Sequence, residues 1–161
     1  MKRLSFISLV VGGLMCCSTG KANITNVDYA DDGDGAIVCP VYTWSGSATW
    51  VGCQIAGDQY WGPAHVVGTI ATDSASDPTL TLSSAINNDT SFTWTAYDVN
   101  VYMSSTFTLS DVSVTTPGDW TVTSALQPVL VNSPLGAYEA QIVFTGGTPV
   151  TVGNDLDFSY A

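Results

Sequence analysis

One stretch of the chain predicts its fold most clearly: Asn87-Asn88-Asp89-Thr90-Ser91-Phe92-Thr93-Trp94-Thr95-Ala96-Tyr97-Asp98-Val99-Asn100-Val101. Turn-forming Asn and Asp residues come first, and Thr, Val and aromatic residues then alternate as they do in β-strands. Neighbouring side chains of a strand point to opposite faces of the sheet, and the apolar residues up to Ala96 occupy even positions. From Tyr97 to Val101 they occupy odd positions. This shift predicts either a bulge near Ala96 or a strand that leaves one sheet for another.

The same alternation recurs along the chain between turn residues, and no apolar spacing typical of a helix occurs after residue 22. The expected strands are Ile24–Tyr29, Ala36–Trp44, Ala48–Ile55, Ala64–Thr72, Thr79–Ile86, Phe92–Met103, Thr106–Val114, Trp120–Thr123, Tyr138–Phe144 and Leu156–Tyr160. We expect an edge strand or a long connection at 124–134 and a turn at Gly146-Gly147. A lone sheet would leave one face uncovered, so these short strands predict an all-β fold, an antiparallel two-sheet sandwich of immunoglobulin-like type.

The first 22 residues have the layout of a secretory signal peptide. Lys2 and Arg3 precede an apolar run at 4–15, and small or polar residues follow as far as Ala22. The run is too short to span a bilayer. We therefore expect cleavage after Ala22 and a single β-sandwich domain at 23–161, without a membrane span, outside the cytoplasm.

The charge distribution excludes several classes of partner. The chain has 161 residues, 3 Lys and Arg against 14 Asp and Glu, and a formal charge of -11. All three cations lie in the first 21 residues, so loss of residues 1–22 would lower the charge to -14. Binding of nucleic acid, or of phosphate through Lys or Arg, requires positive charge, and we expect neither.

Two cysteines, Cys39 and Cys53, remain after the expected cleavage. An exported protein encounters conditions in which disulfides persist, so we expect the two to pair. Closing a loop of about 15 residues would stabilise the fold by roughly 3 kcal/mol on the loop-entropy account.

An acidic cluster lies between the first two expected strands of the domain. Its carboxylates are Asp28, Asp31, Asp32 and Asp34, with glycines at 33 and 35. Calcium prefers several converging oxygen ligands, and glycines let a backbone wrap around the ion. The alternative is a solvated turn, because Asp and Gly both suit turn conformations. Both interpretations stay open at this point.

An aromatic cluster surrounds the expected hairpin. It consists of Tyr42, Trp44, Trp50, Tyr60 and Trp61. Exposed aromatic rings on a rigid sheet form platforms for sugar rings, which would make these residues a ligand-binding site. They would equally serve as cross-strand pairs and core residues of a small all-β domain.

The sequence nominates no catalytic residues. His65 is the only histidine, which excludes a site with several histidine ligands. A Gly-x-Ser-x-Gly elbow, a phosphate-binding loop and a Cys-x-x-Cys pair are all missing from the chain. We therefore expect a protein that is not an enzyme.

Two segments, Asp77–Leu82 and Asn87–Val101, resemble the ectodomain of bacterial PEP-CTERM exported proteins, in which an asparagine-rich turn leads into a strand with Trp and Tyr three residues apart. The resemblance implies an immunoglobulin-like sandwich at the cell surface or in the extracellular matrix. The family also carries a C-terminal sorting signal, Pro-Glu-Pro followed by a transmembrane stretch and arginines, whereas this chain stops at Ala161.

Our first hypothesis is an exported, structural or adhesive component of the bacterial cell surface or extracellular matrix. Its high negative charge would make divalent cations or salt govern self-association. The second hypothesis is a secreted module that binds extracellular polysaccharide through the aromatic cluster and holds calcium in the acidic cluster.

Moderate salt should raise the melting temperature of the exported protein. Its carboxylates would have no Lys or Arg to pair with, so they repel one another, and salt screens that repulsion. Thermal unfolding followed at increasing NaCl concentration measures the effect. A melting temperature that falls with salt would contradict this view of the charge.

Overall fold

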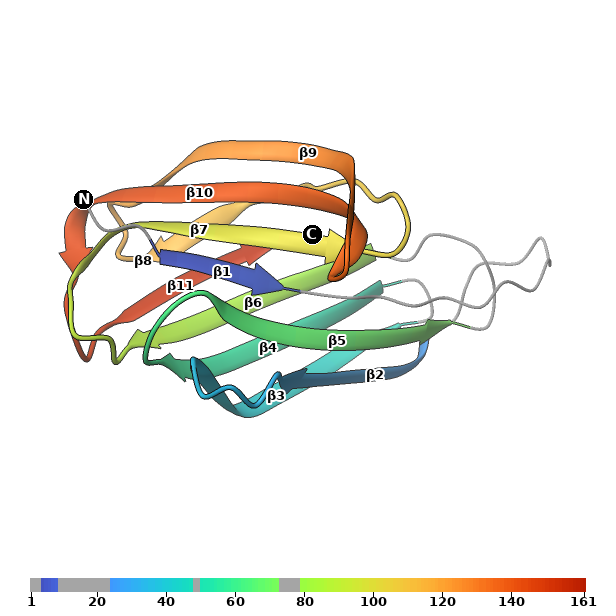
Figure 1. Ribbon diagram of the computed structural model, residues 1–161, viewed down its shortest axis with the longest axis horizontal. Helices are drawn as coiled ribbons and strands as arrows, with labels where there is room; N and C mark the ends of the chain where they lie inside the picture. Colours follow the sequence, from blue (N-terminus) through green and yellow to red (C-terminus); the bar gives the residue numbers. More distant parts are fainter. Residues whose placement is uncertain (1–3, 9–23, 48–49, 73–78) are drawn as a thin grey trace.

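The computed structural model describes residues 4–8, 24–47, 50–72 and 79–161, and the regular secondary structure of these ranges is entirely β. In chain order the described strands are β1 (Leu4–Ser8), β2 (Ile24–Asp31), β3 (Ile37–Ser47), β4 (Trp50–Gln59), β5 (Ala64–Thr72), β6 (Thr79–Asn88), β7 (Trp94–Met103), β8 (Ser113–Thr116), β9 (Thr121–Ser133), β10 (Gly136–Val150) and β11 (Asp155–Tyr160). They form a six-stranded sheet in the order β2-β5-β1-β7-β10-β9 and a five-stranded sheet in the order β3-β4-β6-β11-β8 (Figure 1). The expected all-β fold with two sheets is confirmed.

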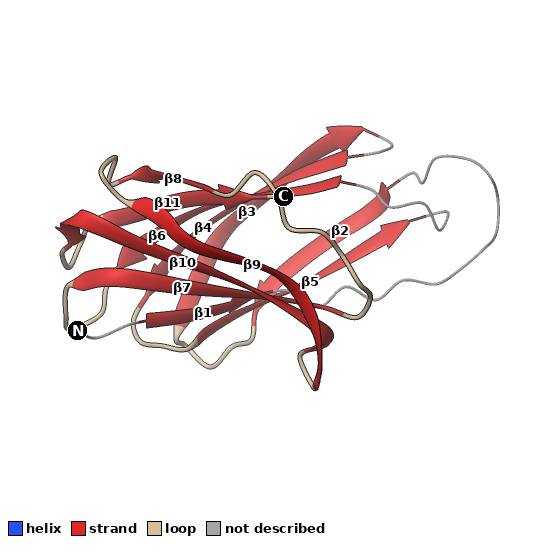
Figure 2. Cartoon of the chain, turned by 90° about the horizontal axis from the view of Figure 1, so that it is seen from above, coloured by secondary structure: helices blue, strands red, loops and turns tan. Residues whose placement is uncertain are grey.

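Aromatic rings join the two sheets. Tyr97 on β7 and Phe144 on β10 face Phe158 on β11, at ring-centroid distances of 5.9 and 5.2 Å. The rings are tilted, as aromatic pairs prefer, and all three side chains are buried. Aliphatic side chains such as Ile142 and Leu156 fill the space around them. The sheets therefore pack face to face as two layers, as in a β-sandwich (Figure 2).

Three strand pairings are parallel among the described strands, although the sequence predicted an antiparallel sandwich. β4 pairs with β6, and β1 pairs with both β5 and β7, in parallel. The first pairing has a simple origin. The chain leaves β4, crosses to the other sheet as β5, and returns to run beside β4 in the same direction.

An irregularity lies opposite Ala96, but its extra residues are on the neighbouring strand and not in β7, where the sequence predicted the bulge. Ala96 pairs with Thr145, whereas Trp94 pairs with Val150, so 146–149 interrupt the ladder on the β10 side. The turn expected at Gly146-Gly147 is therefore wrong, because both glycines lie within β10. A Cβ at Gly146 would overlap the Trp120 indole. Close packing of that ring, and not a turn, requires glycine there.

Most strand boundaries agree with the prediction to within a few residues, but one expected strand is largely missing. The expected strand Thr106–Val114 is wrong over most of its length, because the backbone is irregular at 106–112. A strand begins only at Ser113, where β8 starts. Ser110 exchanges two backbone hydrogen bonds with Ala161, and the Gln127 amide bonds both backbone groups of Leu109. These contacts satisfy the backbone groups of Leu109 and Ser110 without the ladder of a regular strand pair. Of the two alternatives expected at 124–134, an edge strand or a long connection, the structure has the edge strand: residues 124–133 belong to β9, at one edge of its sheet.

The expected signal peptide overlaps β1. Residues 4–8 lie between β5 and β7, in the interior of the six-stranded sheet. Removal of residues 1–22 stays a prediction, as does the single domain at 23–161. Among the described residues, no helix has the length and apolar character needed to cross a bilayer.

A buried asparagine connects the ends of several strands. Asn88, at the end of β6, is fully buried, and its Nδ2 donates to the carbonyl oxygens of Phe92 at 3.0 Å and Val150 at 2.9 Å. Its Oδ1 accepts from the backbone nitrogen of Thr90 at 3.0 Å and from Thr90 Oγ1 at 2.6 Å. The amide thereby makes all four of its possible hydrogen bonds. Trp94 Nε1 donates to the same Thr90 hydroxyl at 3.2 Å, which extends the network into the core.

Replacing Asn88 by aspartate should destabilise the protein by about 3 kcal/mol or more. The substitution keeps the side-chain shape but directs an oxygen at two carbonyl oxygens in a buried site. Urea unfolding measures the difference in free energy. Asn26→Asp, at an exposed position of β2, is the control and should change it by no more than about 0.5 kcal/mol. Similar losses in the two variants would show that the buried amide has no special part in stability.

Candidate functional site

The acidic cluster forms a double turn between β2 and β3. Asp32 Oδ1 accepts from the backbone nitrogen of Asp34 at 3.2 Å, and Asp34 Oδ1 accepts from that of Ala36 at 2.6 Å. Each carboxylate thus closes a turn two residues ahead of itself. Gly33 and Gly35 have φ of 76° and 82°, in the left-handed region that favours glycine. The Asp-Gly-Asp-Gly repeat therefore encodes two successive turns.

His65, for which the sequence indicated no role, joins this turn. It lies near the start of β5, which runs antiparallel to β2, and its Nδ1 is 2.9 Å from Asp32 Oδ2. Ligand atoms of Asp32, Asp34 and His65 lie within 4.8 Å of one another. Sequence reasoning missed the contact because strand alternation does not tell which strands pair.

The surroundings of Asp32 lower its pKa from the ordinary value of 3.8. Partial burial opposes ionisation, but the backbone hydrogen bond from Asp34 and the hydrogen bond and charge of His65 together outweigh it. A carboxyl group whose pKa is lower in the folded than in the unfolded protein stabilises the fold when ionised. That contribution is present above about pH 4 and is lost as the pH falls through the folded-state pKa.

The expected calcium ligands are only partly brought together. Asp32 and Asp34 converge, whereas Asp28 lies three residues before the end of β2 with an exposed side chain. The side chain of Asp31 lies outside the described side chains. The converging group offers two carboxylates and an imidazole nitrogen, while calcium prefers oxygen ligands alone. Calcium binding at this turn stays a prediction.

Two members of the aromatic cluster lie beside the acidic turn. Tyr60 and Trp61 are 41% and 51% exposed, so these two are not core residues. The carbonyl oxygen of Ala36 accepts from the backbone nitrogens of both, at 2.9 and 3.4 Å. A Cβ on Gly35 would stand 3.3 Å from Trp61 Cη2, which places the indole against the turn. The side chains of the other three predicted aromatic residues, Tyr42, Trp44 and Trp50, lie outside the described ones.

A buried glutamine ties this segment to the core. Gln59 is fully buried, and its Oε1 accepts from the Tyr97 hydroxyl at 2.6 Å. Its Nε2 donates to the carbonyl oxygen of Trp61 at 3.1 Å. No motif marks Gln59 in the sequence.

We call the group Asp32, Asp34, Tyr60, Trp61 and His65 the acidic turn site.

The register of β3 against β4 does not place the two cysteines of the expected disulfide, Cys39 and Cys53, opposite each other. Cys53 stands opposite Trp44, and Val38, next to Cys39, stands opposite Asp58. The two cysteines are not opposite each other, so a bridge between them would require a different register. Both cysteine side chains lie outside the described ones, and the disulfide stays a prediction.

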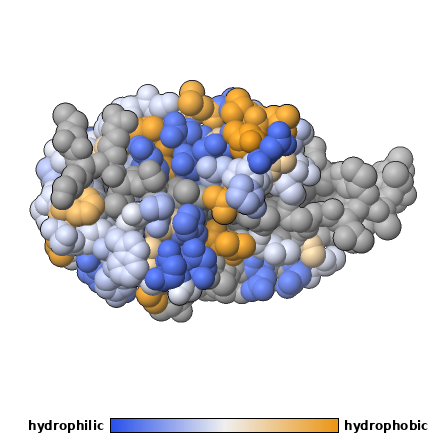
Figure 3. All heavy atoms as spheres, viewed as in Figure 1, coloured by the Kyte–Doolittle hydropathy of each residue, from blue (hydrophilic) through white to orange (hydrophobic). Residues whose placement is uncertain are grey.

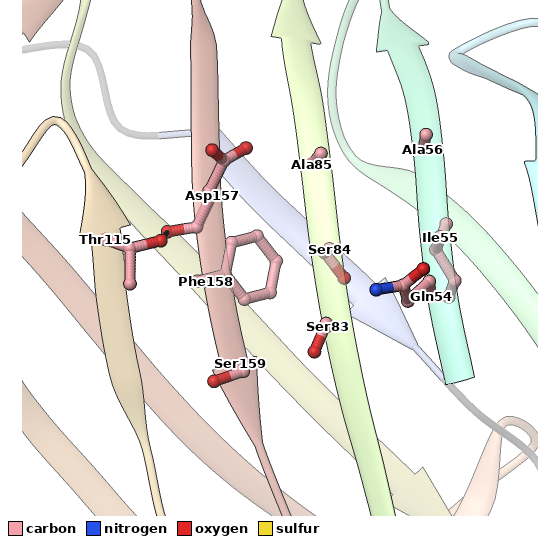
Figure 4. A pocket seen from close by; sticks show the side chains of 10 residues that line it. All are labelled: Gln54, Ile55, Ala56, Ser83, Ser84, Ala85, Thr115, Asp157, Phe158 and Ser159. Carbon is pink, nitrogen blue, oxygen red and sulfur yellow. Dashed lines mark hydrogen bonds between the residues drawn. The ribbon is translucent and has the colours of Figure 1, made fainter. Parts of the chain in front are cut away.

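A shallow groove of about 470 Å³ lies on the outer face of the five-stranded sheet (Figure 4). Its outward side chains are short or polar, among them Gln54, Ser83, Ser159 and Asp157. Among its described lining residues, Asp157 supplies the only carboxylate, and none of them presents an exposed aromatic ring. These described residues offer hydroxyl groups without a stacking surface, so the acidic turn site is the better candidate for recognition.

Comparison with protein-family models, curated proteins and solved structures finds no match to this chain.

Replacing His65 by glutamine should raise the pKa of Asp32 towards its ordinary value. The variant loses the imidazole charge while the hydrogen bond from Asp34 remains. NMR titration of the Asp32 carboxyl carbon measures the pKa in both proteins. Val67→Gln changes an exposed residue of the same strand and should leave the value unaltered. An equal pKa in wild type and His65→Gln would contradict the assigned contact.

Proposed function

We propose that this chain is an exported, non-catalytic structural or adhesive component of the bacterial cell surface or extracellular matrix, and that it associates through the edge strand β9. The observation that carries the proposal is an exposed apolar band on β9. Leu126, Val129, Leu130 and Val131 are 56%, 60%, 61% and 37% exposed. Figure 3 shows apolar atoms gathered at the upper edge of the molecule, where Figure 1 places β9. We call these four residues the β9 band.

The position of β9 explains the exposure of the band. Leu130 pairs with Tyr138, which shares its face with the buried residues Ala140 and Ile142. Leu130 itself remains exposed because β9 is the outermost strand of its sheet. Val129 pairs with Glu139 and so lies on the opposite face. Both faces of the strand therefore present apolar groups to solvent.

The charge of β9 supports contact with a second copy of this chain. Edge strands usually carry charges that prevent association, but Thr121–Ser133 contains none. The chain as a whole has 14 acidic residues, so two copies repel each other least where both are uncharged. Pro128 and a shift of register beside it interrupt the backbone ladder. The contact would therefore rely on apolar side chains more than on added strand hydrogen bonds.

The export pattern and the resemblance to PEP-CTERM ectodomains agree with this proposal. Both favour a bacterial protein that is secreted or held at the cell surface. We also propose the immunoglobulin-like form of the sandwich on the strength of that resemblance.

Leu130→Asp should weaken self-association of the exported protein at least tenfold. The new carboxylate would have to be desolvated against an apolar surface of an already acidic copy. Sedimentation at several protein concentrations, with calcium and with a chelator, measures the dissociation constant. The control is Val152→Asp, at an apolar residue that is 54% exposed on the turn after β10.

The control should change the dissociation constant less than twofold. Higher salt should strengthen association of the unmodified protein, because it screens repulsion between the two acidic copies. A monomer at every concentration and salt level, or equal weakening by both variants, would overturn the β9 contact. An effect of calcium alone would assign association to the acidic turn instead.

The second candidate function is binding of extracellular polysaccharide, and the exposed Tyr60 and Trp61 favour it. A sugar ring stacked on the Trp61 indole would have the carboxylates of the acidic turn within reach of its hydroxyl groups. Calcium could take part through the same carboxylates.

Trp61→Ala should abolish any saturable fluorescence response to soluble polysaccharides. The indole is both the expected stacking surface and the reporter, so calorimetry must accompany the fluorescence measurement. The control is Val67→Ala, which changes an exposed residue of β5. This variant should bind as the unmodified protein does. Absence of binding across neutral and acidic glycans, with and without calcium, would exclude this second function.

A further inference from the structure

β1 fills a slot between two strands that would otherwise both be edges. It runs parallel to β5 and β7 and pairs with each (Figure 1). In the register Phe6 stands between Ala64 of β5 and Val99 of β7. Ser8 stands between Val66 and Val101 in the same way. These four flanking residues are buried, with exposures of 2% or less, so the slot lies over the hydrophobic core.

The segment that fills the slot belongs to the expected signal peptide. The inference rests on the proposed export, which includes cleavage after Ala22. That cleavage would remove β1 together with the rest of residues 1–22. The facing edges of β5 and β7 would then be separated by about 10 Å, twice the spacing of neighbouring strands. Their backbone groups would lack ladder partners, and core residues such as Val66 and Val99 would meet water.

Contacts at one end of the slot oppose its closure by direct pairing of β5 with β7. Gln59, at the end of β4, holds the Tyr97 hydroxyl of β7 at 2.6 Å. The same glutamine holds the carbonyl oxygen of Trp61, three residues before β5 begins at Ala64. These bonds fix the start of β5 relative to β7 through fully buried side chains. Closing a gap of one strand would require a shift of about 5 Å that these bonds resist.

We propose that β5 and β7 form an acceptor slot for one β-strand of another exported polypeptide, which replaces Leu4–Ser8 after export. The segment seated in the structure defines the chemistry of that strand. Leu4–Ser8 is extended, uncharged and apolar at three of its five positions, and it enters parallel to both neighbours. A partner segment of this kind gains main-chain hydrogen bonds from two edges and covers the exposed part of the core. This slot lies three strands away from the β9 edge, in the order β1-β7-β10-β9.

The test begins with the N-terminal sequence of the protein as cells export it. The proposal requires a chain that has lost residues 4–8. That exported chain is then titrated with a synthetic peptide of residues 2–10, labelled for fluorescence anisotropy. The control is the same peptide with Phe6→Pro, which keeps both cations but cannot donate the ladder hydrogen bond at that position.

We expect saturable binding of the first peptide and at least tenfold weaker binding of the proline peptide. Hydrogen exchange should show that the first peptide protects amides of β5 and β7. Export of a chain that still contains residues 4–8 would overturn the proposal. So would equal binding of the two peptides, or full protection of β5 and β7 without any peptide.

A second variant covers the case in which the exported chain does not fold without a strand in the slot. In the uncleaved chain, Phe6→Pro should increase exchange of β5 and β7 amides while the β9 and β10 ladder stays protected. Unchanged protection of β5 and β7 would overturn the proposal. Failure of the slot leaves the β9 contact intact, because Leu130→Asp tests a different edge of the sheet.

Discussion

The buried amide of Asn88 joins the ends of β6 and β10 and the approach to β7 through four hydrogen bonds. A fully buried asparagine is tolerated only when its donors and acceptors are satisfied, and here Phe92, Val150 and Thr90 satisfy them all. Its backbone is equally engaged, because its nitrogen donates to Asn154 and its oxygen accepts from Gly153. One residue thus fixes the end of β6, the approach to β7 and the end of β10. This polar junction closes one end of an otherwise apolar sandwich.

The junction also positions the surface features. The backbone nitrogen of Asp89 donates to the Gln59 carbonyl, and the Gln59 side chain holds Tyr97 and Trp61. The acidic turn site is therefore supported by fully buried groups, although most of its own side chains are exposed and only His65 is half-buried. The β9 band, by contrast, is exposed because β9 stands at the edge of its sheet among the described strands. An acidic chain with an uncharged apolar edge and a supported aromatic turn agrees with the association that we propose.

The sequence predicted the strands well because alternation of apolar residues reports burial directly. It offered the edge strand at 124–134 as one of two alternatives, since a proline is a local signal. It did not locate the extra residues opposite Ala96, because they belong to the neighbouring strand β10. It did not predict the contact of His65 with Asp32 or that of Gln59 with Tyr97, because both depend on which strands become neighbours. β1 was missed for a different reason. Its residues also fit the apolar part of a signal peptide, and the composition of so short a segment does not distinguish a leader from a strand.

Exchange of the Asn88 side-chain amide protons with solvent, followed by NMR, shows whether the junction at Asn88 is closed in solution. Both protons are donated to carbonyl oxygens within a fully buried site. They should therefore exchange only when the whole domain unfolds, at the rate of the most protected backbone amides of β7 and β10. Exchange as rapid as that of an exposed asparagine would show that the junction is open in solution and that Asn88 does not hold the strand ends together.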